Sequence, residues 1–307
     1  MSAGGGTKAI VAALVANAGI ATAKFVGFLI TGSSSMLAES VHSVADTSNQ
    51  GLLLLGQKTA QRRATKLHPF GYGRDRYFWS FVVALMLFTL GSVFALYEGI
   101  HKLQHPEGLT SPLVAVGILV VAIGLETYSF ITAINESKKI KGDASWWGFI
   151  RNSRTPELPV VLLEDLGALV GLVLALMGVG LTMITGNPVF DALGTICIGV
   201  LLGIIAIILI IEMKSLLIGE GASDKDLDVI CDELAAGKVQ RVIHIKTQYI
   251  GPEELLVAAK IALEPQLSLD EVAQAINDAE QRVRNRVPHA RLIYLEPDLD
   301  RTKVASS

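Results

Sequence analysis

The amino-acid sequence predicts an α-helical membrane protein with six transmembrane helices followed by a small cytoplasmic α+β domain. Hydrophobic residues make up 51% of the chain and charged residues only 18%, a balance that soluble proteins of this length seldom have. A helix needs about 20 mostly apolar residues to cross a bilayer. Six runs meet that requirement, at approximately 8–30, 36–57, 78–103, 111–135, 159–183 and 188–212.

Loops rich in glycine, serine and proline separate these helices, because such residues end helices and turn the chain. The basic residues concentrate in two of the other loops. These residues are Lys58, Arg62, Arg63, Lys66, Arg74 and Arg76 after the second helix, and Lys138, Lys139, Lys141, Arg151 and Arg154 after the fourth. The opposite loops hold little beyond Lys102. Since cytoplasmic loops carry the excess of Lys and Arg, we expect both termini to be cytoplasmic.

After Lys214 the composition becomes that of a soluble domain. Its pattern predicts the order αββαβ, with helices at Asp226–Gly237 and Ser268–Val287 and strands at Val239–Ile250, Leu255–Glu264 and Arg291–Glu296. Ser268 and Glu271 have the spacing of a capping box at the start of the second helix. The predicted domains are therefore a membrane domain, residues 1–213, and a cytoplasmic domain, residues 214–307, suited to dimerisation.

The second predicted helix carries four polar residues that fall on one face: Glu39, His42, Asp46 and Asn49. Ionisable side chains inside a bilayer are costly and usually mark an ion path or a buried partner. Since His42 and Asp46 stand one turn apart, both can bind one cation. The sequence therefore predicts a metal site on this helix.

Helical rise places further polar residues in the same layer, near the middle of the membrane. Asp46 lies about 16 Å from the inner end of its helix, Glu126 about 13 Å, and Glu164 and Asp165 about 9–11 Å. Asn17 and Asn49 fall at similar depth, although an isolated asparagine more often bonds neighbouring helices than binds metal. Glu126 has the alternative of pairing with a basic loop residue. Glu39 is within a turn of the outer surface, where a solvated carboxylate is the simpler interpretation.

Glu164 and Asp165 are adjacent, so their side chains point about 100° apart and only one is expected to face the ion fully. We favour Asp165, with Glu164 supporting it or carrying a proton. Imidazole and carboxylate ligands suit zinc, and equally cobalt, iron(II) or manganese. The two cysteines, Cys197 and Cys231, lack metal-site spacing and are expected to be packing residues.

Three stretches together resemble the cation diffusion facilitator family, and the likeness runs over nearly all of the chain. They are Ser40–Gln50, which includes the His42–Asp46 pair, the glycine-rich His68–Arg74 before the third helix, and the αββαβ tail. Val161–Asp165 and Leu181–Pro188 make the chain most similar to the branch that contains the mitochondrial zinc transporter of animals. The resemblance implies a homodimeric metal/proton antiporter that works by alternating access and has a ferredoxin-like cytoplasmic domain.

The resemblance also implies particular ligands. His42 and Asp46 correspond to the pair on the second helix, and Asp165 to the second member of the pair on the fifth. The first member falls on Val161, which cannot bind metal, so Glu164 and Glu126 become the replacements. An oxygen-richer site of this kind shifts preference toward manganese or iron(II).

Two other sites of the family are reduced in this chain. The loop site keeps His68 but has Tyr72 at its other usual histidine, and the tail keeps His244, with Lys260 and Tyr294 at its other positions. We therefore expect a tail that dimerises without a binuclear metal centre.

The expected function is efflux of a divalent cation, zinc foremost, in exchange for protons. The alternative is a membrane-anchored metal sensor or scaffold without turnover. The sequence predicts neither an enzyme nor a prosthetic group, since the metal is cargo and no Ser/His or His-Glu-x-x-His arrangement appears. A net charge of −3 offers nucleic acid no basic field. A bacterial cytoplasmic membrane is the expected location, because no Arg- and Ser-rich transit peptide precedes the first helix.

Overall fold

A computed structural model describes residues 3–299 of the 307 apart from residues 107 and 110. The chain separates into two compact units. The helical unit contains the residues up to Thr59 together with Asp75–Lys214, and the second unit contains Ala60–Arg74 together with the residues from Ser215 onward. The prediction that both termini are cytoplasmic falls on residues 1–2 and 300–307, which lie outside the described residues.

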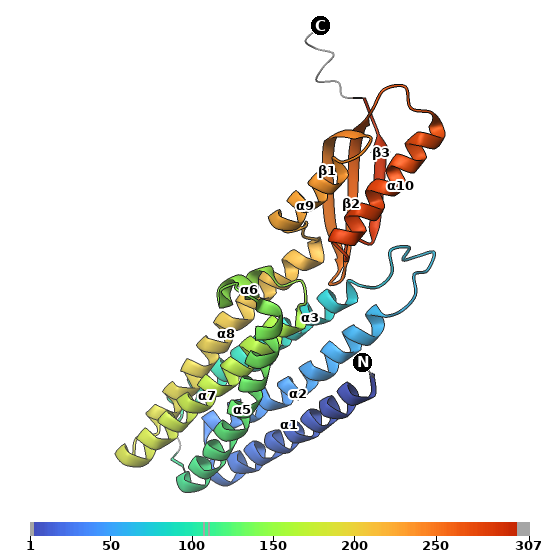
Figure 1. Cartoon of the computed structure of the whole chain (residues 1–307). Helices are drawn as coiled ribbons and strands as arrows, with labels where there is room; N and C mark the ends of the chain where they lie inside the picture. The colour runs from blue at the N-terminus through green and yellow to red at the C-terminus, as the bar shows by residue number, and fades with distance from the viewer. Residues whose placement is uncertain (1–2, 107, 110, 300–307) are drawn as a thin grey trace, which may run out of the picture. The chain divides into compact units, whose positions relative to one another are not determined.

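Six long helical rods form the helical unit and run side by side in one bundle (Figure 1). Each predicted apolar run coincides with one of them, apart from one residue at the start of the fourth and sixth runs. In chain order they are α1 Ala3–Thr31, α2 Ser34–Ala60, the continuous rod α3 Asp75–Met86, η1 Leu87–Val93 and α4 Phe94–Gln104, then α5 Pro112–Lys141, α7 Glu157–Thr185 and α8 Val189–Ile218. The short helix α6, Trp146–Asn152, lies between α5 and α7. The segment η1 is π-helical, which the sequence does not predict.

Four rods of the described part are long and apolar enough to cross a membrane: Asp75–Gln104, Pro112–Lys141, Glu157–Thr185 and Val189–Ile218. The apolar helix Asn17–Thr31 is shorter, and α2 does not qualify. Its buried polar residues lower its hydropathy without shortening it. Large apolar side chains such as Val121, Tyr128 and Ile184 are exposed on the outside of the unit, as lipid-facing residues are.

Close helix packing in this unit depends on small residues. A Cβ atom at Gly99 of α4 would lie 2.7 Å from Ile196 of α8, and one at Gly199 of α8 would lie 2.7 Å from Leu96 of α4. Glycines therefore let α4 and α8 approach backbone to backbone, which is how helices associate in membranes. This packing fixes the rods around the polar interior described below.

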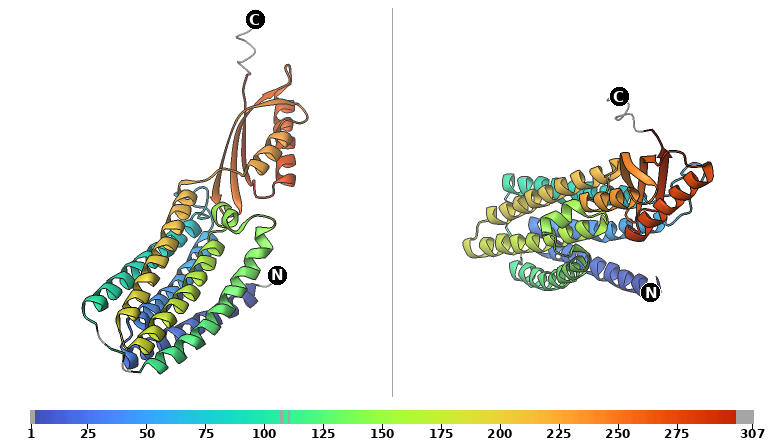
Figure 2. Two further views of the ribbon diagram at one scale, coloured as in Figure 1. Left: turned by 90° about the vertical axis from the view of Figure 1, so that its left-hand side faces the viewer. Right: turned by 45° about the horizontal axis from the view of Figure 1, so that its top comes forward.

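The second unit contains a three-stranded sheet covered on one face by two helices (Figure 2). Its elements are α9 Asp224–Leu234, β1 Val239–Gly251, β2 Glu254–Leu263, α10 Leu269–Arg286 and β3 Leu292–Pro297. The strand order is β1-β2-β3, with β1 antiparallel and β3 parallel to β2. Ile230, Leu234, Val257, Ile261 and Val283 belong to the core between sheet and helices. The predicted order αββαβ is confirmed, with ends that differ by a few residues.

The predicted capping box is also confirmed. The Ser268 hydroxyl accepts from the Glu271 backbone N–H at 3.3 Å, and the Glu271 carboxylate accepts from the Ser268 backbone N–H at 2.9 Å. Without these two hydrogen bonds, both backbone N–H groups would be unpaired at the start of α10. The backbone hydrogen bond of Ser268, with further help from Lys238 and the Ser268 hydroxyl, lowers the pKa of Glu271 to about 2.

This box makes the start of α10 sensitive to acid. A carboxylate with a lowered folded-state pKa stabilises the fold above its ordinary pKa and loses that effect as the pH falls through the lowered value. We expect amide-exchange protection in the first turn of α10, measured in the full-length protein, to fall between pH 4.5 and about pH 2. Glu271→Gln should remove this pH dependence and Asp270→Asn should keep it. An unchanged profile in Glu271→Gln would contradict the assignment.

Candidate metal site

The polar face of α2 is turned into the helical unit. Glu39 and Asn49 are fully buried, His42 is 1% exposed and Asp46 is 9% exposed. The expectation that Glu39 is solvated is therefore wrong. Burial of so many polar groups is unfavourable unless other polar groups or ions compensate it, so the partners of this face define the site.

His42 and Asp46 face each other along α2, with Nε2 and Oδ2 3.6 Å apart. The carboxyl groups of Asp46 and Glu164 lie close enough to interact directly, and the Asn49 side-chain amide donates to Glu164 Oε1 at 2.6 Å. Glu164 therefore connects α7 to the metal-binding face that the sequence predicts on α2.

Asp165 points elsewhere. Its Oδ2 accepts a hydrogen bond from the Ser129 hydroxyl of α5 at 3.0 Å. The sequence favours Asp165 as the member that faces the ion, whereas in the structure it is Glu164 that contacts Asp46 and Asn49. Val161, one turn before Asp165, is half-buried and offers no donor atom.

Glu126 of α5 is half-buried and close enough to interact electrostatically with Glu39, Asp46, Glu164 and Asp165. The carboxylates that the depth argument assigned to one layer are thus near one another. Asn17 is half-buried in α1, and no hydrogen bond joins it to the other candidates within the described residues.

Several buried polar atoms of this face have no hydrogen-bond partner among the described residues. They are Glu39 Oε1, both ring nitrogens of His42, Asp46 Oδ1 and Asn49 Oδ1. Buried polar atoms are nearly always paired, so each exception calls for an explanation, and an ion is one. Imidazole nitrogen and carboxylate oxygen are the atoms that bind zinc and similar metals. In the described part, however, no three His, Cys, Asp or Glu side chains converge closely enough to hold an ion.

Lys24 is the residue that the sequence analysis missed. It belongs to α1, is fully buried, and donates to Glu39 Oε2 at 3.1 Å and to the Ser43 hydroxyl at 2.8 Å. It is the single charged residue between positions 9 and 31 of the sequence, which is the signal that could have revealed it. A lysine within an apolar helix needs either a buried partner or a path to the interface.

Backbone glycines leave room for these side chains. A Cβ atom at Gly171 of α7 would lie 2.7 Å from Glu39 Oε1. The π-helical segment η1 brings Gly91 next to His42, with a Cβ position 3.8 Å from His42 Nδ1. π-Helical turns occur often at functional sites, where they redirect the chain locally.

The start of α2 is fixed by a buried carboxylate of α8. Asp191 accepts from the Ser33 hydroxyl at 2.9 Å, from the Ser34 backbone N–H at 2.9 Å and from the Ser34 hydroxyl at 3.1 Å. It thus caps the N-terminus of α2 in the manner of an N-cap acid. Lys102, which the sequence analysis assigned to a loop, is buried near this end and donates to Gly32 O at 2.9 Å.

The remaining histidine candidates belong to the second unit. His68 is exposed, with its ring centroid 4.7 Å from that of Tyr72. His244 lies opposite Lys260 in the sheet register and lines a hollow of about 250 Å³ together with Lys260, Tyr294 and Glu296. The Lys260 ammonium contacts Glu296 and Asp298 at 3.0 Å each, and these hydrogen bonds raise the pKa of Lys260.

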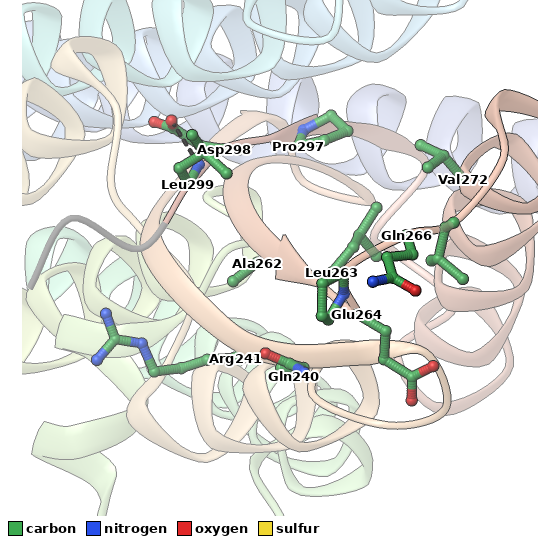
Figure 3. Close-up of a pocket in the computed structure, with 12 residues that line it drawn as sticks. Gln240, Arg241, Ala262, Leu263, Glu264, Gln266, Val272, Pro297, Asp298 and Leu299 are labelled. Atoms are coloured by element: carbon green, nitrogen blue, oxygen red, sulfur yellow. Dashed lines mark hydrogen bonds between the residues drawn. The ribbon is translucent and has the colours of Figure 1, made fainter. Parts of the chain in front are cut away.

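A larger pocket of about 670 Å³ lies at the ends of the strands in the same unit. Figure 3 shows its charged side chains Arg241, Glu264 and Asp298 spread around the opening, so that they do not converge on one point. The acid-rich interior of the helical unit is therefore the stronger candidate for a cation.

Comparison with known proteins agrees with this choice of unit. Residues 10–218 match the family model described as the cation efflux transmembrane domain. The chain belongs to the cation efflux family. The matched residues contain every candidate in α1, α2, α5 and α7, so the polar interior lies within the part that defines the family.

The relatives that this chain resembles include zinc antiporters, a metal tolerance protein and magnetosome proteins. The mitochondrial proton-coupled zinc antiporter SLC30A9 of Mus musculus is 34% identical over 242 residues, 78% of this chain and 42% of its own. Metal tolerance protein C4 of Arabidopsis thaliana is 32% identical over 267 residues, 85% of this chain and 58% of its own. Magnetosome protein MamB of Magnetospirillum gryphiswaldense is 25% identical over 272 residues, 87% of this chain and 85% of its own. The chain thus spans about two fifths of the antiporters' length, and the predicted family resemblance is confirmed.

The close approach of Gly171 to Glu39 can be tested. Gly171→Ala should destabilise the protein by about 1–3 kcal/mol, because the new methyl group displaces a carboxylate that Lys24 holds in place. Gly180→Ala on the same helix is the matched control, since a Cβ atom there meets nothing within 4 Å. Thermal unfolding of the detergent-solubilised variants provides the comparison. Equal stability of the two variants would show that Glu39 is not confined between α1 and α7.

Proposed function

We propose that this protein moves a divalent cation across a membrane in exchange for protons, and that the polar interior between α2 and α7 is the transport site. The observation that carries the proposal is the set of buried, unpaired acceptors on α2 beside the carboxylates of α7 and α5. Membership of the cation efflux family and the names of the relatives, a proton-coupled zinc antiporter among them, support it.

The proposed ligands are His42, Asp46 and Glu164, with Asp165 and Glu126 close by. The first three are chosen because Asp46 lies beside both His42 and Glu164. Asn49 holds the Glu164 carboxylate toward α2. Asp165 is assigned a supporting role through its bond to Ser129, rather than a place among the first ligands.

Exchange for protons follows from the same contacts. Two buried carboxyl groups that lie this close repel each other when both are ionised, so the Asp46–Glu164 pair is suited to hold either a proton or a metal ion. His42 adds a second possible proton acceptor, because neither of its ring nitrogens has a hydrogen-bond partner among the described residues. Metal release outward as protons return would then be coupled by direct competition at one site. Alternating access of this site to the two sides completes the proposed cycle.

We further infer that all six rods cross the membrane, including α1 and α2. The rich supply of lysine and arginine in the loops after α2 and α5 favours a cytoplasmic side for those loops and for both termini. The sheet unit would then be cytoplasmic and would join two copies as a ferredoxin-like module. A bacterial cytoplasmic membrane remains the proposed location.

Zinc is the favoured cargo because the proposed ligands combine one imidazole with carboxylates. Manganese, iron(II) and cobalt are the alternatives, since a site with more oxygen than nitrogen discriminates weakly among them. The relatives named as zinc antiporters add support for zinc.

The direct test is zinc uptake into proteoliposomes under an imposed pH gradient. The parent protein should accumulate zinc only when the gradient is present, and Asp46→Asn should reduce the rate at least about tenfold because it removes a charged ligand. Asp143→Asn, which changes an exposed carboxylate, is the control and should transport normally. Zinc binding without gradient-driven uptake would instead favour a sensor or scaffold.

The different contacts of Glu164 and Asp165 make a second prediction. Glu164→Gln should weaken equilibrium zinc binding by about 10–100-fold, the usual cost of disturbing a metal's ligand shell, and Asp165→Asn should cost less. Isothermal titration of the purified variants, with manganese as a competitor, measures both affinity and selectivity. If Asp165→Asn weakened zinc binding more than Glu164→Gln did, Asp165 would be the direct ligand, as the sequence predicts.

A further inference from the structure

The ion pair between Lys24 and Glu39 places a positive charge of the protein itself inside the proposed metal site. Both side chains are fully buried, and they come from different helices, α1 and α2. A buried charge is tolerated only when it is paired, so each of these groups depends on the other. Glu39 stands one turn before His42 on the same face, which brings the pair next to the proposed ligands.

Glu39 is only partly engaged by this lysine. Its Oε2 accepts from Lys24, whereas its Oε1 is buried and has no hydrogen-bond partner among the described residues. Oε1 is packed against the backbone of α7 at Gly171. One oxygen of Glu39 is therefore neutralised by an ammonium group, and the other remains suited to a second cation.

The ammonium group also acts beyond Glu39. Lys24 is close enough to influence His42, Asp46 and Glu126 electrostatically. A divalent cation that enters among these groups meets both attraction from the carboxylates and repulsion from Lys24. Electrostatic interactions are strong in a buried site of low dielectric constant, so the position of one ammonium group matters for affinity.

Lys24 has room and a second partner if it leaves Glu39. The Ser43 hydroxyl already accepts from the ammonium group at 2.8 Å. The lysine also lines a groove of about 570 Å³ between α1 and α5, whose other lining residues include the small residues Gly19, Ala23 and Gly117. Small neighbours let the aliphatic stem shift without a steric clash.

We propose that Lys24 is a tethered competitor of the transported metal: its ammonium group and the divalent cation alternate as partners of the Glu39 carboxylate. The inference rests on the proposed transport site and adds a residue that limits how tightly the site holds its cargo. A carrier must release what it binds, and a built-in cation that returns to Glu39 helps to expel the metal. Lys24 thereby acts on the metal through Glu39 as a positioning residue.

The test is zinc affinity of the purified full-length protein, measured by competition with a fluorescent chelator. Lys24→Gln should bind zinc about tenfold or more tightly than the parent, because a competing charge is gone, and should transport it more slowly. Lys24→Arg keeps the charge and should retain the parental affinity. Lys102→Gln changes another buried lysine of the same unit, one that donates to the Gly32 carbonyl and not to a carboxylate, and should leave affinity unchanged. A purely structural role for Lys24 predicts weaker binding, and unchanged or weaker binding in folded Lys24→Gln overturns the proposal.

A second pair of variants avoids a buried, unpaired Glu39. Removing Lys24 should tighten zinc binding much less in the Glu39→Gln background than in the parent, because the carboxylate for which the two cations compete is gone. An equal gain in affinity in both backgrounds would show that Lys24 does not act through Glu39 and would also overturn the proposal. Asp46→Asn distinguishes failure of the competition proposal from failure of the proposed transport site. Zinc binding that does not depend on Asp46 contradicts the proposed site, whereas binding that depends on Asp46 but not on Lys24 contradicts only the competition.

Discussion

The burial of several carboxyl groups in one layer of an apolar helical unit is the constraint on which this structure depends. Glu39, Asp46, Glu164 and Asp165 are almost wholly removed from solvent, and removing ionised groups from water costs far more than any single contact returns. The helices therefore have to supply compensation. Lys24 supplies an ammonium group, and Asn49 and Ser129 supply hydrogen bonds. What these partners leave unpaired is a set of acceptors suited to a metal ion.

The surrounding fold serves to hold this layer. Asp191 fixes the start of α2 against α8, and glycines in α4, α7 and α8 let the helices approach closely. The π-helical segment η1 brings the third rod beside His42. Because few groups neutralise the buried carboxylates, a change in any of them disturbs the charge balance of the polar interior. The proposed exchange of a metal ion for protons needs this balance. The same balance explains why a residue outside the proposed ligand set, Lys24, bears on affinity.

Much of this arrangement could be predicted from sequence because it depends on local patterns. Run lengths identify the six rods, and spacing along α2 identifies the shared face of His42 and Asp46. Alternation and the Ser268 capping box identify the small sheet domain. Helical rise predicts a common layer for Glu126, Glu164 and Asp165, and the structure has these three carboxyl groups close enough to interact.

The rest depends on how helices are rotated about their axes and paired with one another, which local patterns do not specify. Glu164 and Asp165 have equal depth, and only the rotation of α7 decides that Glu164 contacts α2. The pairing of Lys24 with Glu39 joins positions 15 residues apart on two helices, and nothing in the periodicity of either predicts it.

The role of α2 as a metal-binding face is most directly tested by zinc-edge X-ray absorption on the loaded protein. The account predicts one imidazole nitrogen and two or more carboxylate oxygens at about 2.0–2.2 Å, with the imidazole signal lost in His42→Gln. A zinc environment that is unchanged in His42→Gln would contradict it.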